Sequence, residues 1–150
     1  MYDSETLEFD SEMTDIPVFP FDFGPNPFVI DIKKAAIQND NFRSTLWTGD
    51  HLQITLMSIP FKGGIGLEVH SDLDQYLRIE EGLGLVQLGT DQFSMDTQYL
   101  VFEDYGIFVP AGIWHNILNI GNKPLKLTSV YAPPHYPWGT THPTKADDME

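Results

Sequence analysis

One stretch decides the fold of this chain, PAGIWHNILN at residues 110–119. Pro110 and Gly112 suit the backbone angles of a tight turn, so the stretch is interpreted as a turn that delivers a β-strand. His115 lies near the start of that strand. The turn therefore fixes the position of a side chain that can ligate a metal or make a hydrogen bond.

A second group of polar residues lies earlier in the chain. Glu68 and His70 are separated by one residue. Residues i and i+2 of a strand project from the same face, so these two side chains are expected to point the same way. Gln75 begins the next expected strand across a short turn, which allows it to lie opposite them. These three residues and His115 are the candidates for a site.

The surrounding pattern is that of an all-β protein. Apolar and polar residues alternate over 52–59 with the period of two that is typical of a strand. The only expected helix lies between Ile30 and Phe42, and Asn39 begins the polar run that ends it. Short strands at this spacing predict a sandwich or a barrel. The strands are expected at 52–59, 67–70, 75–80, 85–88, 98–102, 107–109, 115–120 and 125–131.

The chain has 150 residues, the size of one domain. We divide it into an acidic N-terminal arm rich in proline and aromatic residues, at 1–27, and a barrel with a C-terminal arm, at 28–150. Residues 1–22 hold seven acidic side chains and no basic one, which predicts a mobile tail. The aromatic residues that follow, up to Phe28, are expected to dock on the barrel.

The charge of the chain excludes several kinds of partner. Lysine and arginine number 8 against 22 aspartate and glutamate, giving a net charge of −14. A nucleic acid or an anionic membrane surface requires a basic face, so neither is expected as a partner. With no cysteine, neither a disulfide nor a Cys-ligated metal is possible. No apolar run approaches the roughly 20 residues that span a bilayer. We expect a cytoplasmic protein whose ligands are small molecules and metal ions.

The stretch at 110–119 resembles the second motif of the cupin superfamily, P-x-G-x-x-H-x-x-x-N. Pro110, Gly112, His115 and Asn119 occupy its fixed positions, although Asp104 stands where the motif begins with glycine. Cupins are small double-stranded β-helix barrels of the jelly-roll type. The resemblance therefore implies that the chain is an all-β jelly roll with an acidic N-terminal tail and one short helix.

The first cupin motif, H-x-H followed by a glutamate and a glycine, is altered. His70 and Gly82 match it, but Glu68 replaces the first histidine, Gln75 replaces the glutamate, and Lys62 stands at the leading glycine. The usual set of three histidines and one glutamate thus becomes two histidines, one glutamate and one glutamine.

The resemblance implies a metal site made of Glu68, His70, Gln75 and His115. Two imidazoles and one carboxylate are sufficient for Fe(II), Mn(II), Ni(II) or Zn(II). A second register, with Asp72 in place of one histidine, fits the family spacing less well. A barrel without metal, in which Glu68 is only the ion-pair partner of His70, stays open as an alternative.

The C-terminal stretch at 131–145 is similar to that of small cupins often labelled mannose-6-phosphate isomerase-like. That resemblance implies a metal-dependent isomerase acting on a small polar substrate such as a sugar phosphate. Arg78, His135 and His142 are the candidates for substrate contact, and no catalytic residue is assigned. An Fe- or Mn-dependent dioxygenase and a non-catalytic binding barrel are the alternatives. The two proline-rich arms are expected to pair two copies into a homodimer.

Overall fold

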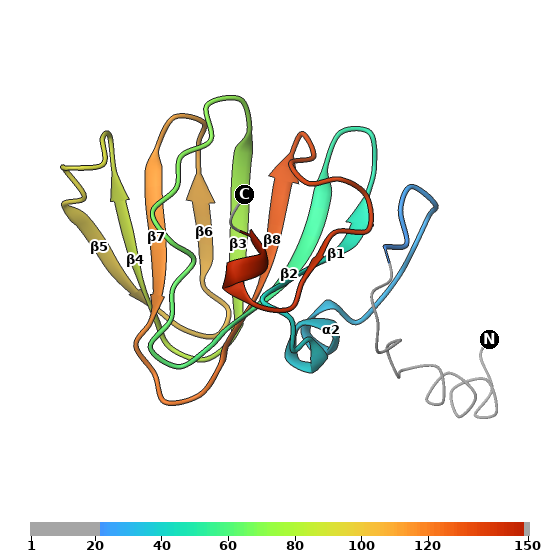
Figure 1. Cartoon of the computed structure of the whole chain (residues 1–150), viewed down its shortest axis with the longest axis horizontal. Coiled ribbons are helices and arrows are strands. Elements are labelled where there is room, and N and C mark those ends of the chain that lie inside the picture. Colours follow the sequence, from blue (N-terminus) through green and yellow to red (C-terminus); the bar gives the residue numbers. More distant parts are fainter. Residues whose placement is uncertain (1–21, 149–150) are drawn as a thin grey trace, which may run out of the picture.

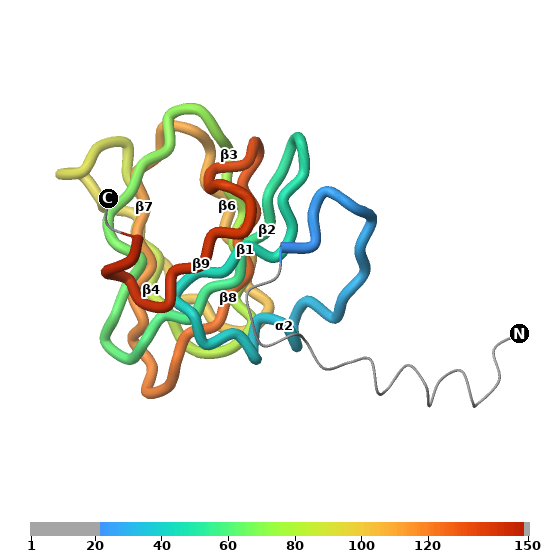
Figure 2. The backbone as a smooth tube through the Cα atoms, turned by 45° about the vertical axis from the view of Figure 1, so that its right-hand side comes forward, coloured from blue at the N-terminus to red at the C-terminus, as the bar shows by residue number. Residues whose placement is uncertain are grey.

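Two antiparallel sheets make up most of the computed structural model, which describes residues 22–148 (Figure 1). The larger sheet has the strand order β6-β3-β8-β2-β1-β9, and the smaller has the order β5-β4-β7. The sheets face each other, and the backbone closes into a barrel (Figure 2). The strands are β1 Arg43–Thr48, β2 Gln53–Ile59, β3 Asp74–Glu81, β4 Gly84–Gly89, β5 Thr97–Val101, β6 Gly106–Val109, β7 Trp114–Asn119, β8 Leu125–Ala132 and β9 Thr141–His142.

The helix α2 spans Ile32–Gln38, within the range predicted for it. The Asp31 side chain accepts a hydrogen bond from the Lys34 backbone N–H and so caps the first turn. The backbone N–H of Asn39 closes the last turn. The helix lies outside the barrel, where its buried Ala35 and Ala36 pack against Leu46 and Leu56 of the larger sheet. A 3₁₀ turn, η1, spans Lys145–Asp148.

The described part of the N-terminal arm docks on the barrel, as predicted. Phe23 and Phe28 stack with their ring centroids 4.1 Å apart and pack against the cluster beneath α2. The buried Asp22 carboxylate accepts hydrogen bonds from the backbone N–H groups of Thr48, at 2.9 Å, and Gly139, at 3.1 Å. It therefore joins the arm to both β1 and the C-terminal segment. The expected mobile tail lies outside the described residues.

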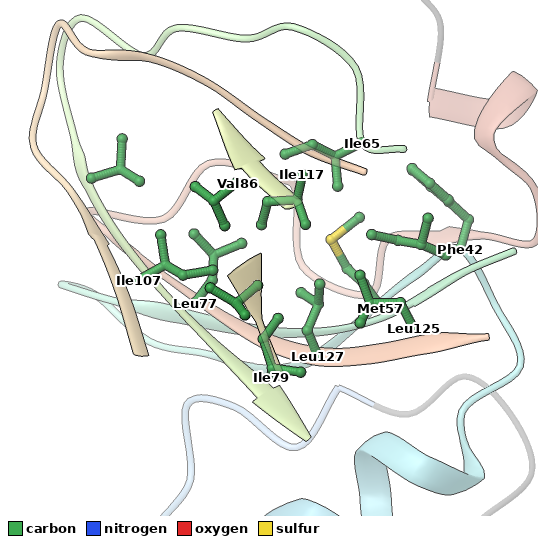
Figure 3. Close-up of a cluster of buried hydrophobic side chains, with 13 residues drawn as sticks. Phe42, Met57, Ile65, Leu77, Ile79, Val86, Ile107, Ile117, Leu125 and Leu127 are labelled. Atoms are coloured by element: carbon green, nitrogen blue, oxygen red, sulfur yellow. The ribbon is translucent and has the colours of Figure 1, made fainter. Parts of the chain in front are cut away.

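Apolar side chains from both sheets fill the barrel interior (Figure 3). The inward residues follow the alternation of each strand, so that Ile79, Leu127 and Met57 form one row across β3, β8 and β2. The cluster supplies the hydrophobic free energy that holds the sheets together. Its buried members are Phe42, Met57, Ile59, Ile65, Leu77, Ile79, Val86, Val101, Ile107, Val109, Ile117, Leu125 and Leu127.

The predicted strand at 67–70 is wrong as a regular strand. Residues 63–70 run beside β7 but make only the isolated bridges Gly64↔Leu118 and Glu68↔His115. Gly66, with a φ of +94°, lies between these bridges and interrupts the ladder. Its backbone N–H donates instead to the side chain of Asn116. Conversely, the short strands β1 and β9 were not predicted.

No helix among residues 22–148 is long and apolar enough to cross a membrane.

Candidate metal and ligand site

The inner face of the larger sheet changes from apolar to polar toward one end. In strand register, Gln75 of β3 lies beside Tyr131 of β8, which lies beside Gln53 of β2. All three side chains are buried. Thr55 and Ser129 form the next row below them. The polar end of the interior is therefore built by the same alternation that builds the core, with polar residues at inward positions.

Glu68 and His70 reach this end of the barrel from the irregular segment beside β7. The backbones of Glu68 and His115 exchange two hydrogen bonds, of 3.0 and 2.9 Å, which fix the segment against the strand. Glu68 Oε2 lies 3.5 Å from His70 Nε2, so the two side chains do point together. The rings of His70 and His115 are 5.5 Å apart between centroids. We call Glu68, His70, Gln75 and His115 the donor cluster.

Three atoms of this cluster are buried without a hydrogen-bond partner among the described residues, His70 Nε2, His115 Nε2 and Gln75 Oε1. His115 Nδ1 lies 3.1 Å from the Ile113 carbonyl oxygen, which can accept only if Nδ1 carries the proton. The Nε2 lone pair is then free and faces the interior. Gln75 Nε2 donates to Ser129 Oγ at 2.9 Å, and this leaves the amide oxygen unused. Leaving a buried polar atom unpaired costs about 1–3 kcal/mol, so these atoms indicate a ligand.

Burial sets the charge of the donor cluster. It lowers the pKa of His70 to about 4, with the nearby His135 and His115 adding to the effect. It also lowers the pKa of His115. It raises the pKa of Glu68 to about 7, despite the opposing attraction of Arg43. Both histidines are therefore neutral at pH 7, as metal ligation requires, while Glu68 is close to half ionised.

A chain of rings leads away from the donor cluster toward the end of the described chain. His70 is 4.6 Å from His135 and His135 is 4.6 Å from Tyr136, between ring centroids. Tyr136 in turn is 5.7 Å from His142. His135 thus lies beside the cluster, whereas His142 is separated from it by the rings of Tyr136 and His135; contact of either residue with a substrate stays a prediction.

Arg78 is not brought to this site. It follows Gln75 by three positions on β3 and so faces the opposite side of the sheet. There its guanidinium pairs with Glu80 and with Asp104. Glu80 is buried and Asp104 is exposed, so the structure gives Arg78 a place in an ion-pair group on the outer face of β3 and not beside the donor cluster.

The buried cation near the site is Arg43, which the sequence analysis missed. Its side chain is 1% exposed and points inward from β1, beside Met57. Its Nη1 lies 2.7 Å from Asp148 Oδ2, and its guanidinium carbon lies 4.6 Å from the Tyr136 ring centroid. No motif surrounds Arg43 or Asp148 in the sequence, so only the register of an unpredicted strand could have revealed them.

The donor cluster does not form a closed metal site by itself. Within residues 22–148, no group of three or more His, Cys, Asp or Glu side chains converges closely enough to hold an ion. The cluster contains three such side chains, and its fourth potential donor is the Gln75 amide. The unpartnered His115 and Gln75 atoms fit a metal, but metal binding stays a prediction.

Comparison with known proteins supports the fold assignment. The profile of the Cupin domain family Cupin_2 matches residues 55–131. The uncharacterized protein YrkC of Bacillus subtilis (strain 168) is 54% identical over 126 residues, which are 84% of this chain and 68% of YrkC. The crystal structure of BH2720 from Bacillus halodurans has a TM-score of 0.85 and 58% identity, and the alignment covers 85% of this chain and 97% of that one.

A more distant solved structure has the same fold. It is a predicted oxalate decarboxylase from Thermotoga maritima, with a TM-score of 0.50 and 20% identity over 57% of this chain and 69% of that one. At this identity the likeness concerns the fold alone. With the Cupin_2 profile matching half of the residues, and with relatives above 50% identity, the jelly-roll barrel is confirmed and the chain belongs to the Cupin_2 family of cupin domains.

Proposed function

We propose that this protein binds one divalent transition metal through His70, His115, Gln75 and Glu68, and that it is an enzyme acting on a small polar molecule. The observation that carries the proposal is the group of three buried atoms without a hydrogen-bond partner among the described residues, His70 Nε2, His115 Nε2 and Gln75 Oε1. A buried acceptor with no donor in reach among the described residues is a position that a cation can fill. In this proposal, Glu68 and Gln75 of the altered first motif replace two of the usual ligands, and the metal site itself is kept.

The donor set suits Fe, Mn, Ni or Zn. Two imidazole nitrogens, one carboxylate and one amide oxygen combine the ligand types that these borderline ions accept. A bound ion would act as a Lewis acid that polarises a carbonyl or hydroxyl oxygen of the substrate. The Ile113 carbonyl would keep the His115 ring in the required tautomer.

Glu68 is the group of this cluster that can hold a proton near neutral pH. Burial raises its pKa to about 7, close to the working range of a general acid or base. Its carboxyl lies beside His70, and Tyr131 and His135 line the same end of the barrel. A substrate bound there would meet a proton carrier where Glu68 is not itself a ligand, because coordination to a metal keeps a carboxylate ionised.

Two reaction classes fit this arrangement. The first is a proton transfer between adjacent carbons, as in the isomerisation of a sugar phosphate or a related hydroxy-carbonyl compound. The second is an Fe- or Mn-dependent dioxygenation. A binding barrel without turnover is the remaining alternative.

The decisive experiment measures bound metal by elemental analysis on the untagged full chain. Wild type is compared with His70→Ala and His115→Ala, and the control is His51→Ala, an exposed histidine between β1 and β2. We expect about one metal per chain in wild type and in the control, and loss of the metal in both site variants. Absence of metal after reconstitution with Fe, Mn, Ni and Zn would overturn the proposal. Oxygen uptake or isomerisation by the loaded enzyme would then identify the reaction class.

A further inference from the structure

Arg43 is a buried cation with few partners. A guanidinium has five N–H donors, and a buried one requires acceptors for them. Here Nη1 meets the Asp148 carboxylate at 2.7 Å, while Nη2 meets the Met57 sulfur at 3.6 Å. Nε has no hydrogen-bond partner within residues 22–148. Asp148 is therefore the one strong acceptor in the surroundings described, and several donors of Arg43 are left over for a ligand.

Asp148 comes from a segment that is weakly attached to the barrel. It is the last residue of η1, a single 3₁₀ turn in which no residue is buried. Besides Arg43, its carboxylate lies 3.3 Å from His142 Nδ1 and 3.4 Å from the Tyr136 hydroxyl. The segment runs along the rim of the barrel, shown in red in Figure 2. A rigid, buried guanidinium is thus met by a carboxylate on a turn with little apolar packing to hold it.

Arg43 belongs to the same interior as the donor cluster. The Tyr136 ring lies over its guanidinium and links it, through His135, to His70. On the inner face of β1 the next inward residue after Arg43 is Thr45, whose buried hydroxyl has no partner among the described residues. The guanidinium and this hydroxyl are the donors that a small oxygen-rich ligand would need beside the cluster.

We propose that Arg43 binds a carboxylate group of the substrate. The Asp148 carboxylate pairs with Arg43 in the ligand-free protein, and the substrate displaces it. A carboxylate is the ligand class because a carboxylate is the group that Arg43 already holds, and a planar guanidinium matches it. A single buried guanidinium balances one negative charge, whereas a phosphate brings about two. This inference deepens the proposed function by naming the substrate class, but it does not require the metal.

The test is calorimetric titration of the full chain with malonate, after chelator treatment and dialysis and again after loading with Mn. Asp148→Asn removes the competing charge and keeps the size of the side chain. An internal competitor reduces apparent affinity by the fraction of molecules in which the site is free. If Asp148 occupies Arg43 in roughly nine of ten molecules, Asp148→Asn binds malonate about tenfold more tightly than wild type.

The matched control is Asp147→Asn, in the same turn. The Asp147 carboxylate accepts hydrogen bonds from the Thr144 backbone N–H and hydroxyl, and the ion pair of Arg43 is with Asp148, so Asp147→Asn makes the same change of charge without removing that ion pair. It is expected to bind malonate within about twofold of wild type. Neutral malonamide is expected to bind neither wild type nor either of these two variants. Arg43→Lys, which keeps the charge but not the planar fork, is expected to weaken binding at least about fivefold.

Several results would overturn the inference. They are no gain in Asp148→Asn, an equal gain in Asp147→Asn, unchanged binding in Arg43→Lys, or tighter binding of inorganic phosphate than of malonate. The two proposals fail separately. If the tenfold gain is present in chelated protein and no metal is ever found, the metal proposal alone is lost. If metal is found and the gain is absent, the carboxylate proposal alone is lost.

Discussion

The ionised form of Glu68 is expected to destabilise the metal-free protein, and Glu68→Gln should reveal this. Burial raises the pKa of Glu68 from its ordinary 4.5 to about 7, and its side chain is 21% exposed. An acid with a raised pKa contributes stability that is fully present below pH 4.5 and is lost as the pH rises through 7. The loss in the free energy of unfolding is about 3 kcal/mol at pH 8, because the pKa of Glu68 shifts between the unfolded and folded states and each pKa unit is worth about 1.4 kcal/mol.

The assay is urea denaturation of chelated wild type and Glu68→Gln at pH 4.5 and pH 8. The neutral variant should be about 3 kcal/mol more stable than wild type at pH 8, or about 6–12 °C higher in Tm for a chain of this length. At pH 4.5 the two should agree within about 0.5 kcal/mol. Glu103→Gln, an exposed carboxylate paired with Lys33, is the control and should change stability by less than about 1 kcal/mol at both pH values. An equal difference between wild type and Glu68→Gln at both pH values would refute the reasoning.

Two further predictions follow from the same structure, and a third, the homodimer, comes from the sequence. Burial lowers the pKa of His70 to about 4, so the contribution of this residue to stability is present above pH 6.5 and is lost as the pH falls toward 4. In urea denaturation across that range, the free energy of unfolding of wild type should fall by about 3 kcal/mol more than that of His70→Gln. Parallel losses in the two proteins would contradict this. The buried Asn119 side chain donates to the carbonyls of Ile59 and Lys123 and accepts from the Gly121 N–H. Asn119→Ala should therefore lower the free energy of unfolding by about 2–4 kcal/mol, and a change under about 1 kcal/mol would contradict this prediction. The homodimer is tested by light scattering at physiological salt, where the mass of a single chain would refute it.

The fold was predictable because it depends on local signals. Turn residues at Pro110 and Gly112, and the alternation of apolar and polar residues over the first part of β2, are visible in one sequence. The edge strand β9 was not, because two residues of strand have no period to recognise. The predicted strand at 67–70 failed because Gly66 adopts a positive φ that interrupts pairing, and a lone glycine does not reveal its φ in the sequence.

The candidate site was only half predictable. His70 and His115 stand in motif positions, so the sequence alone brings them together. Arg43 and Asp148 are more than a hundred residues apart, and their contact depends on how the C-terminal segment passes β1 through β9. Arg78 was expected near the site because it is one of few cations on the barrel strands, but its odd separation from Gln75 places it on the outer face.

The unpaired polar atoms are not scattered through the barrel, and this distribution argues for function over accident. The inward row of Ile79, Leu127 and Met57 is apolar and closely packed, whereas the row that contains Gln75 and Tyr131 is polar. Filling the second row with apolar residues would remove the desolvation penalty of its polar groups and stabilise the barrel. A fold that keeps unsatisfied acceptors at one end, when the alternation would accept leucine or valine there equally well, supports the proposal that these acceptors bind a ligand.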